Sequence, residues 1–168
     1  GFGMKNGVYC EEVMVIIAAR RLQRPVRWTA DRSESLVSDA HARDAVSDAE
    51  LALDGEGKFL AMRVRTNHAV GAYLGEVATV PVGLGSTMYV GSYDLPICHI
   101  QVNAVFTNTT LISPYRGAGR PEAGYVIERL VDAAAVEMGI DPVELRRRNY
   151  IKQAAMPYET AIGSNYDS

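Results

Sequence analysis

The clearest pattern in the chain is an alternation of apolar and polar residues between positions 43 and 72. Apolar side chains occupy every second position at 49–53, and apolar positions resume from Phe59 to Val70. The residues between them, Asp-Gly-Glu-Gly at 54–57, are typical of turns. A period of two on both sides of a turn predicts a long β-hairpin.

Apolar residues three or four positions apart mark two longer segments. Residues 121–138 carry an apolar face that begins at Pro121, which a first helical turn tolerates, and ends at Gly139. Residues 8–23 carry a second stripe, which stops before Pro25 and has arginines at its C-terminal end, where cations suit the helix dipole. Both segments are predicted helices. The earlier stripe consists of Val13, Ile16, Ile17 and Leu22.

Shorter patterns predict the remaining elements. Asp31 and Asp141 each precede a helical segment as N-cap residues, with a glutamate three positions later that can close a capping box. The shorter predicted elements are strands at 26–29 and 97–106, helices that begin after Asp31 and Asp141 and end near Leu36 and Tyr150, a glycine-rich loop with at most a short helix at 73–93, and an irregular tail after Lys152.

Together these elements predict one α+β domain over residues 1–168, with antiparallel strands, including the long hairpin, and helices packed on one face. The net charge of −3 argues against nucleic acid as a partner. Apolar stretches are far shorter than the roughly 20 residues of a membrane span. The chain begins inside a glycine-rich turn without an initiator Met, so we expect a piece of a longer subunit.

Two cysteines, Cys10 and Cys98, are too few for a disulfide framework. A single bridge between them stays possible, although buried free thiols, which pack as small hydrophobes, are favoured. A reducing, cytoplasmic compartment is therefore expected.

The candidate chemistry lies in a glycine turn before the long helix, Pro-Tyr-Arg-Gly-Ala-Gly-Arg-Pro-Glu at 114–122. Gly117 and Gly119 permit backbone angles closed to other residues, and the helix that follows presents unpaired N–H groups. Arg116 and Arg120 add forked donors, so the turn suits a phosphate or another oxo-anion. A structural turn whose arginines pair with surface carboxylates explains the same residues equally well.

Other candidates carry weaker signals. Gly1-Phe2-Gly3 also precedes a predicted helix, but such a glycine pair alone favours a plain turn. The three histidines lack metal-ligand spacing and are interpreted as structural, and the helix carboxylates are interpreted as solvated faces. These residues are His41, His68 and His99, and Glu11, Glu12, Glu122, Glu128 and Asp132.

Several strings carry a family resemblance in order along nearly the whole chain. They are Phe2-Gly3-Met4-Lys5, Arg24-Pro25-Val26-Arg27-Trp28, Asp31-Arg32-Ser33-Glu34, Ala42-Arg43-Asp44, Pro114-Tyr115-Arg116-Gly117-Ala118-Gly119-Arg120-Pro121-Glu122-Ala123, Met138-Gly139-Ile140-Asp141-Pro142 and Leu145-Arg146-Arg147-Arg148-Asn149. The chain resembles the large, molybdopterin-binding subunit of the xanthine dehydrogenase/aldehyde oxidase/carbon monoxide dehydrogenase family, in its glycine-type, carbon monoxide dehydrogenase-like branch.

The resemblance implies a molybdenum cofactor-binding domain of a molybdenum hydroxylase, an oxidoreductase that hydroxylates an aldehyde or heteroaromatic carbon with oxygen from water. It implies a molybdenum–molybdopterin cofactor in the cytosine dinucleotide form, a small organic substrate, and iron–sulfur and flavin subunits or domains as partners. By the same resemblance Arg116 is the catalytic residue. The implied cofactor-binding residues are Gly1, Phe2, Gly3, Tyr115, Arg116, Gly117, Ala118 and Gly119.

Departures from the family pattern narrow these expectations. Gly117 stands where carbon monoxide dehydrogenases proper carry a copper-binding cysteine, which argues against copper-dependent oxidation of carbon monoxide. Asn6 and about Leu84 match the Glu and Arg positions of purine hydroxylases, and Ala118 is small where those enzymes often carry an aromatic residue. The family's general-base glutamate lies near the far C-terminus of the subunit, so the 168 residues alone are expected to be inactive.

Two alternatives remain beside this hypothesis. One is a non-catalytic, stand-alone module of the same fold that binds a partner subunit or a small anion. The other is an unrelated α+β binding protein with glycine turns. The molybdenum hypothesis requires that the turns at Phe2 and Arg116 meet in space and that the Arg116 segment is open to a ligand.

Overall fold

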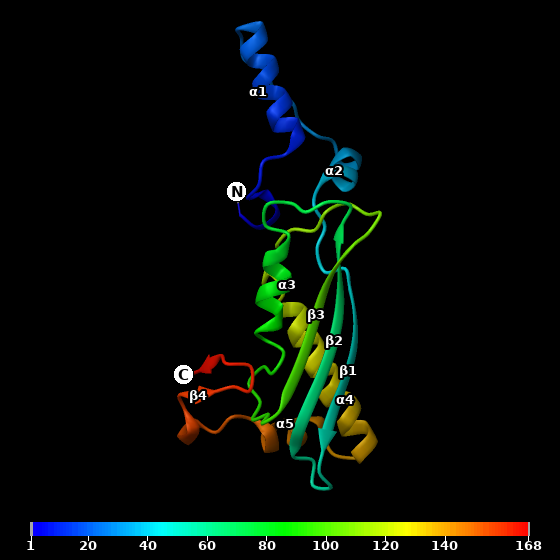
Figure 1. The fold of residues 1–168 in the computed structure, drawn as a ribbon, viewed down its shortest axis with the longest axis vertical. Coiled ribbons are helices and arrows are strands. Elements are labelled where there is room, and N and C mark those ends of the chain that lie inside the picture. Colours follow the sequence, from blue (N-terminus) through cyan, green and yellow to red (C-terminus); the bar gives the residue numbers. More distant parts are fainter. Residues whose placement is uncertain (1, 168) are drawn as a thin grey trace.

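The structure is a computed structural model that describes residues 2–167 (Figure 1). Its elements, in chain order, are η1 (Gly3–Lys5), α1 (Cys10–Leu22), α2 (Arg32–Ser38), β1 (Ala45–Leu53), β2 (Phe59–Gly71), α3 (Thr79–Ser86), β3 (Cys98–Phe106), α4 (Arg120–Met138), α5 (Pro142–Asn149), η2 (Gln153–Ala155), β4 (Tyr158–Glu159) and β5 (Asn165–Tyr166). The α+β class predicted from the sequence is confirmed.

The predicted long hairpin is formed by β1 and β2, which pair antiparallel with Ala45 opposite His68. The Asp54 carboxylate closes the connecting turn by accepting hydrogen bonds from the amides of Glu56 and Lys58, both at 2.9 Å. A register shift next to Leu53 moves the buried positions of β2 from Phe59 to the even-numbered residues from Met62 onward. The inner face of β2 therefore points consistently at the core.

Strand β3 pairs with β2 in parallel, with Met62 opposite Cys98. The expectation of antiparallel strands is therefore wrong for this pair, although the strand itself is confirmed. The physical reason is the long connection at 72–97, which includes α3 and returns the chain to the end of the sheet where β2 begins. A parallel pair needs a crossover of this length, whereas a hairpin needs only a short turn.

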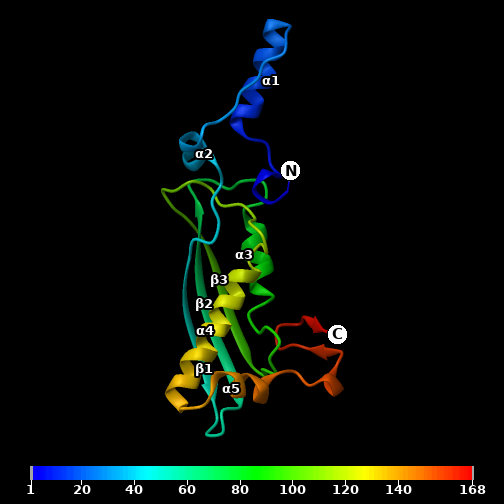
Figure 2. The ribbon, with the colours of Figure 1, turned by 180° about the vertical axis from the view of Figure 1, so that it is seen from behind.

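Helix α4 lies across one face of the sheet, and α3 lies beside it and contacts both α4 and β3 (Figure 2). Ala123, Ile127 and Val131 of α4 are buried against a core that includes Val64 of β2. Large buried aromatic residues, among them Tyr89, fill the space beside α3. The predicted packing of helices on one face is confirmed for α3 and α4.

Local signals placed the ends of several helices correctly. Asp31 and Glu34 form the predicted capping box at the start of α2. Asp141 caps α5, but Glu144 does not close a box there, because its carboxylate pairs with Arg148 at 3.0 Å. Gly139 ends α4 with φ 65°, a backbone conformation that glycine adopts at low cost.

The N-terminal region differs most from expectation. Helix α1 forms where it was predicted, but none of its residues is buried, and it projects away from the sheet (Figure 1). Ile16, on its apolar stripe, is 65% exposed. Residues 26–29 form no strand, since neither sheet of residues 2–167 offers them a partner.

Both cysteines are free, so the alternative of a disulfide is wrong within the structure. Cys98 is half-buried, whereas Cys10 is exposed because it begins the projecting helix α1. No helix in the described part of the chain is long and apolar enough to cross a membrane.

Candidate cofactor site

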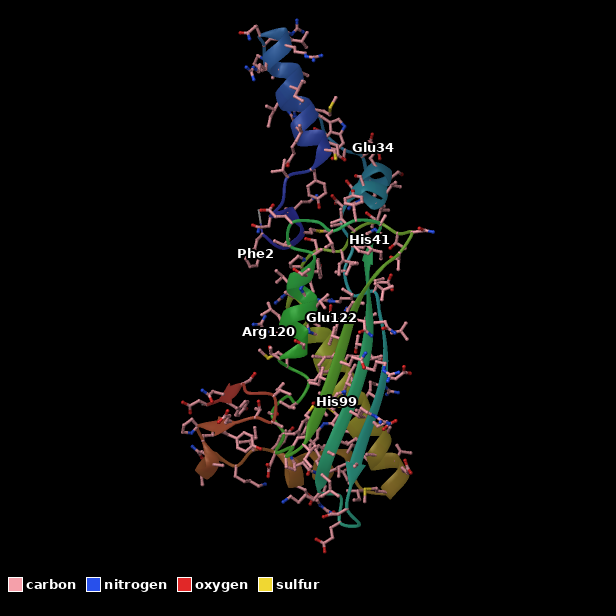
Figure 3. The ribbon with its side chains drawn as sticks, in the orientation of Figure 1. Phe2, Glu34, His41, His99, Arg120 and Glu122 are labelled. Atoms are coloured by element: carbon pink, nitrogen blue, oxygen red, sulfur yellow. The ribbon has the colours of Figure 1, made fainter. Side chains whose placement is uncertain are left out.

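The two glycine turns singled out in the sequence meet in space. Gly3 adopts φ 62°, and a Cβ atom on it would lie 2.8 Å from the carbonyl oxygen of Pro114. Phe2 and Arg120 lie on the same side of the molecule (Figure 3). The first turn therefore touches the start of the second, which is the contact that the molybdenum hypothesis required. Gly1 lies outside the described residues.

The second turn bends through three consecutive residues in the left-handed region. The φ angles are 97° at Gly117, 46° at Ala118 and 94° at Gly119. A Cβ atom on Gly119 would overlap the carbonyl oxygen of Pro81 and lie 2.7 Å from the amide nitrogen of Gly85. Helix α3 therefore fixes the turn from behind, and only glycine allows so close an approach.

The front of this turn is open. Tyr115, Arg116 and Gly117 are exposed, so the expected opening at the Arg116 segment is present. Within residues 2–167, the amides of Arg116, Gly117 and Gly119 donate no hydrogen bond, and the Arg116 side chain has no ion pair. Helix α4 follows at once, with its N-terminal N–H groups. These donors are free to meet a ligand.

A third segment, residues 40–43, is hydrogen-bonded to the chain beside each of the two turns. The His41 amide donates to the carbonyl oxygen of Leu111 at 3.0 Å, and the Ser113 amide donates to the carbonyl oxygen of His41 at 2.9 Å. The Tyr9 hydroxyl donates to the carbonyl oxygen of Met4 at 2.9 Å and accepts from the Ala40 amide at 3.5 Å. Residues 40–43 thus tie the first turn to the second.

Arg43, at the end of this segment, contacts the second turn and was not among the candidate residues of the sequence analysis. Its guanidinium donates to the carbonyl oxygen of Arg116 and lies 5.0 Å from the centre of the Tyr115 ring. The only sequence signal was its place in Ala42-Arg43-Asp44, one of the strings that carries the family resemblance.

The interpretation of the α4 carboxylates as a solvated face is wrong for Glu122. Its side chain is only 13% exposed, and its Oε2 atom is buried without a hydrogen-bond partner among the described residues. Glu128 and Asp132 are roughly half exposed, but both accept hydrogen bonds from Arg146, at 2.7 and 2.9 Å. The first turn of α4 packs close to the sheet, and α5 supplies the arginine, so neither contact could be read from helical spacing.

A small polar cluster lies in the core near Glu122. The Tyr89 hydroxyl and the Thr66 hydroxyl are 3.0 Å apart, and Thr66 lies 2.8 Å from the Ser47 hydroxyl. Burial lowers the pKa of His68, which the Glu122 carboxylate partly opposes. Burial also raises the pKa of Tyr89. A buried histidine that stays neutral agrees with the structural role expected for His68.

Beside this cluster, between β1 and α4, lies a cleft of about 600 Å³ whose lining includes Arg43, Glu122, Tyr125 and Arg129. The other histidines, His41 and His99, are exposed and lie far apart along the molecule (Figure 3). No group of three or more His, Cys, Asp or Glu side chains within residues 2–167 is arranged to hold a metal ion directly. The donors that line the two turns are backbone amides and guanidinium groups.

These groups fit an anionic cofactor. Free amides at a helix N-terminus and exposed arginines bind phosphate and other oxo-anions through charge-assisted hydrogen bonds. Arg116 and Arg120 are exposed at the turn, and the Arg120 guanidinium donates to the carbonyl oxygen of Gly117 at 3.4 Å. The other interpretation, a structural turn whose arginines pair with carboxylates, does not describe Arg116, which has no such partner among residues 2–167.

Residues 1–150 match the family described as molybdopterin cofactor-binding domain. The chain belongs to this family. Membership excludes the alternative of an unrelated binding protein and confirms the family resemblance found in the sequence. The cofactor class of this molybdopterin-binding domain is thereby established at the level of the family.

Named relatives of this molybdopterin-binding domain include two bacterial subunits. It is 39% identical over 96% of its length to the 6-hydroxypseudooxynicotine dehydrogenase complex subunit gamma of Paenarthrobacter nicotinovorans, and covers 20% of that protein. It is 40% identical over its whole length to the carbon monoxide dehydrogenase large chain of Hydrogenophaga pseudoflava, and covers 21% of it. The chain thus spans about a fifth of the length of these relatives.

Solved structures share the fold of this molybdopterin-binding domain. The crystal structure of quinoline 2-oxidoreductase from Pseudomonas putida 86 superposes with a TM-score of 0.92 and 36% identity, over 99% of this chain and 22% of that one. The structure of the Cu,Mo-CO dehydrogenase superposes with a TM-score of 0.90 and 36% identity, over 100% of this chain and 22% of that one. These superpositions cover nearly the whole chain, so they include the parallel β3 and the projecting α1.

Proposed function

We propose that this domain holds a molybdenum–molybdopterin cofactor, in its cytosine dinucleotide form, within a molybdenum hydroxylase. The observation that carries the proposal is the meeting of two glycine turns beneath unpaired amides and an exposed arginine, in a chain of the molybdopterin-binding family. When bound, the cofactor supplies the transfer of an oxygen atom from water to a carbon centre, with removal of two electrons.

The proposed cofactor contacts come from both turns. The backbone of Phe2 and Gly3, with Gly1 preceding them, forms one side. The second turn forms the other side through residues 115–119, that is Tyr115, Arg116, Gly117, Ala118 and Gly119. Arg116 is the proposed catalytic residue, because its exposed guanidinium can hold an anionic group of the cofactor or substrate in place.

The reaction class follows from the relatives and the pocket residues. Relatives named for dehydrogenation or hydroxylation of small nitrogen-containing compounds and of carbon monoxide support an aldehyde or heteroaromatic compound as substrate. Gly117, where a copper-binding cysteine would stand, argues against copper-dependent chemistry. Asn6 and Leu84 argue against xanthine.

The wider setting is also a proposal. Residues 1–168 are proposed to form one domain-sized part of a longer subunit, supported by the one-fifth share of the relatives' length that they cover. Relatives named as one subunit or chain of a complex support iron–sulfur and flavin subunits or domains as electron acceptors. Two free cysteines support a reducing, cytoplasmic compartment.

The test is the Arg116→Ala variant in the intact enzyme that carries this domain. Turnover per bound molybdenum should fall by at least about tenfold, the effect of losing one charge-assisted contact of roughly 1.5 kcal/mol. Arg65→Ala, which removes an exposed arginine from the sheet, is the matched control and should leave turnover unchanged. Wild-type turnover per molybdenum in Arg116→Ala would reject the catalytic role. Absence of molybdenum and pterin from the intact protein would favour a non-catalytic module instead.

A further inference from the structure

Three observations converge on Arg43, which lies outside the two glycine turns. Its guanidinium donates to the carbonyl oxygen of Arg116, lies 5.0 Å from the centre of the Tyr115 ring, and lies 4.0 Å from the Glu122 carboxylate. One side chain thus contacts the turn at two successive residues and the helix that follows it.

The backbone of Arg43 is itself strained. It adopts φ 64°, and Arg43 and Ala118 are two of the three non-glycine residues with positive φ within residues 2–167. Such conformations cost about 1 kcal/mol or more and persist only where surrounding contacts impose them. Here the imposing contacts are the hydrogen bonds between His41 and residues 111–113, which hold the segment against the second turn.

Glu122 places a buried carboxylate next to Arg43. The Glu122 side chain is 13% exposed, and its Oε2 atom accepts no hydrogen bond from the described residues. A buried carboxylate is costly unless a cation neutralises it, and Arg43 is the cation within 4.0 Å. This pair therefore links Arg43, whose side chain is 39% exposed, to α4 as well as to the turn.

We propose that Arg43 is a positioning residue for the cofactor loop: it holds residues 115–118 in the conformation that leaves the amides of Arg116 and Gly117 and the Arg116 side chain free for a ligand. Arg43 acts through the carbonyl oxygen of Arg116 and the Tyr115 ring, and Glu122 holds it there. The consequence for the cofactor rests on the proposed function, whereas the effect on the loop does not.

Lysine cannot replace arginine in this role. The planar Arg43 guanidinium lies over the Tyr115 ring, donates one hydrogen bond to the Arg116 carbonyl oxygen and lies 4.0 Å from Glu122, and a compact lysine ammonium cannot span these three contacts. Arg43→Lys keeps the charge beside Glu122 and is expected to fold, so it separates loss of the fork from loss of the charge. Arg43→Ala removes both.

The experiment is amide hydrogen exchange by mass spectrometry on the intact protein. Exchange of the two hydrogen-bonded amides of the loop, Ala118 to the Tyr115 carbonyl oxygen and Arg120 to the Gly117 carbonyl oxygen, should rise at least about tenfold in Arg43→Ala. The rise should be smaller in Arg43→Lys, and the tenfold effect matches about 1.4 kcal/mol. Glu122→Gln should raise it too. Exchange in β2 and in the centre of α4 should not change. Arg65→Ala, an exposed arginine remote from the loop, is the control for removing a charge.

A second readout is the molybdenum content per subunit, which should fall at least about threefold in Arg43→Ala. Unchanged exchange of the Ala118 and Arg120 amides in both Arg43 variants would overturn the proposal. A lowered molybdenum content with unchanged exchange would also overturn it, since Arg43 would then bind the cofactor itself. The proposed function is judged separately by Arg116→Ala. If only that variant behaves as wild type, the positioning role survives and the catalytic role does not.

Discussion

Burial gives the two cysteines different reactivity. Desolvation raises the pKa of the Cys98 thiol to about 11, whereas Cys10 is exposed at the start of α1. At pH 8 only about 0.1% of Cys98 is thiolate, the nucleophilic form. Iodoacetamide should therefore label Cys10 well before Cys98, at least about 100-fold faster, as read by peptide mass spectrometry. Denatured protein, as the control, should label both cysteines equally. Equal rates in the folded protein would contradict the burial of Cys98.

The raised pKa of Cys98 also determines how the contribution of this thiol to stability changes with pH. Folding raises the pKa of Cys98 from its ordinary value of 9.0, so the folded state holds the proton more tightly than the unfolded state. The contribution of this group to stability is full below about pH 9 and is lost as the pH rises through about 11.

Asn149 is a single buried side chain that joins two distant parts of the chain. Its amide oxygen accepts from the Phe59 amide at 2.8 Å, and its nitrogen donates to the carbonyl oxygens of Gly57 and Leu145. Asn149→Ala should lower the free energy of unfolding by about 2–4 kcal/mol, because it leaves buried backbone groups unpaired. Urea unfolding measures the loss. Asn108→Ala, at an exposed position, should change stability by less than about 0.5 kcal/mol.

Sequence reasoning at this scale succeeded where the signal is local and failed where it is tertiary. The Asp31 cap needs only a glutamate three positions later, so it was predictable. Glu122 carries the same spacing as a solvated helix residue, but its burial depends on where α4 meets the sheet. Arg43 likewise depends on contacts with residues more than 70 positions away in sequence. No periodicity contains that information.

The contact between α3 and the start of α4 depends on glycine. In Gly119→Ala, the new methyl group would overlap the Pro81 carbonyl oxygen, and the φ of 94° would be strained for any other residue. We expect a loss of about 3 kcal/mol or more in the free energy of unfolding, measured by urea titration. Gly124→Ala, in the interior of α4 with open space around it, is the matched control and should stabilise by up to about 1 kcal/mol. Equal stability of the two variants would show that the turn does not pack as described.

Element order was largely predictable, but element pairing was not. The hairpin of β1 and β2 follows from two alternating runs and a turn of four residues. Strand β3 has the same alternation, and alternation does not distinguish a parallel partner from an antiparallel one. The deciding feature is the 72–97 connection, whose glycine-rich sequence conceals α3. Because α3 has no clear amphipathic pattern, the crossover connection between β2 and β3 was not predicted.

At the scale of the whole molecule, the candidate site lies between a packed body and a projecting N-terminal region. The main core is formed by the sheet, α4, residues 89–95 and Leu145 of α5, whereas α1 buries none of its residues and projects from the body (Figure 1). The first glycine turn belongs to the N-terminal region, and the second begins the helix that forms the core. The approach of the two turns was expected because both carry strings of the family resemblance, whereas the exposure of the apolar stripe of α1 was not expected.

This uneven distribution of burial predicts a contrast between two isoleucines. Ile127 is 1% exposed in the core, and Ile16 is 65% exposed on α1. Ile127→Ala should lower the free energy of unfolding by about 2–5 kcal/mol, because it leaves a cavity, whereas Ile16→Ala should change it by less than about 0.5 kcal/mol. Urea unfolding, followed by a signal from the sheet, measures both. Because few tertiary contacts protect α1, its amides should also exchange faster than those of α4. A loss in Ile16→Ala as large as that in Ile127→Ala would mean that α1 packs against the body in solution. The first glycine turn would then be supported by α1 as well as by Pro114 and the Tyr9 hydroxyl.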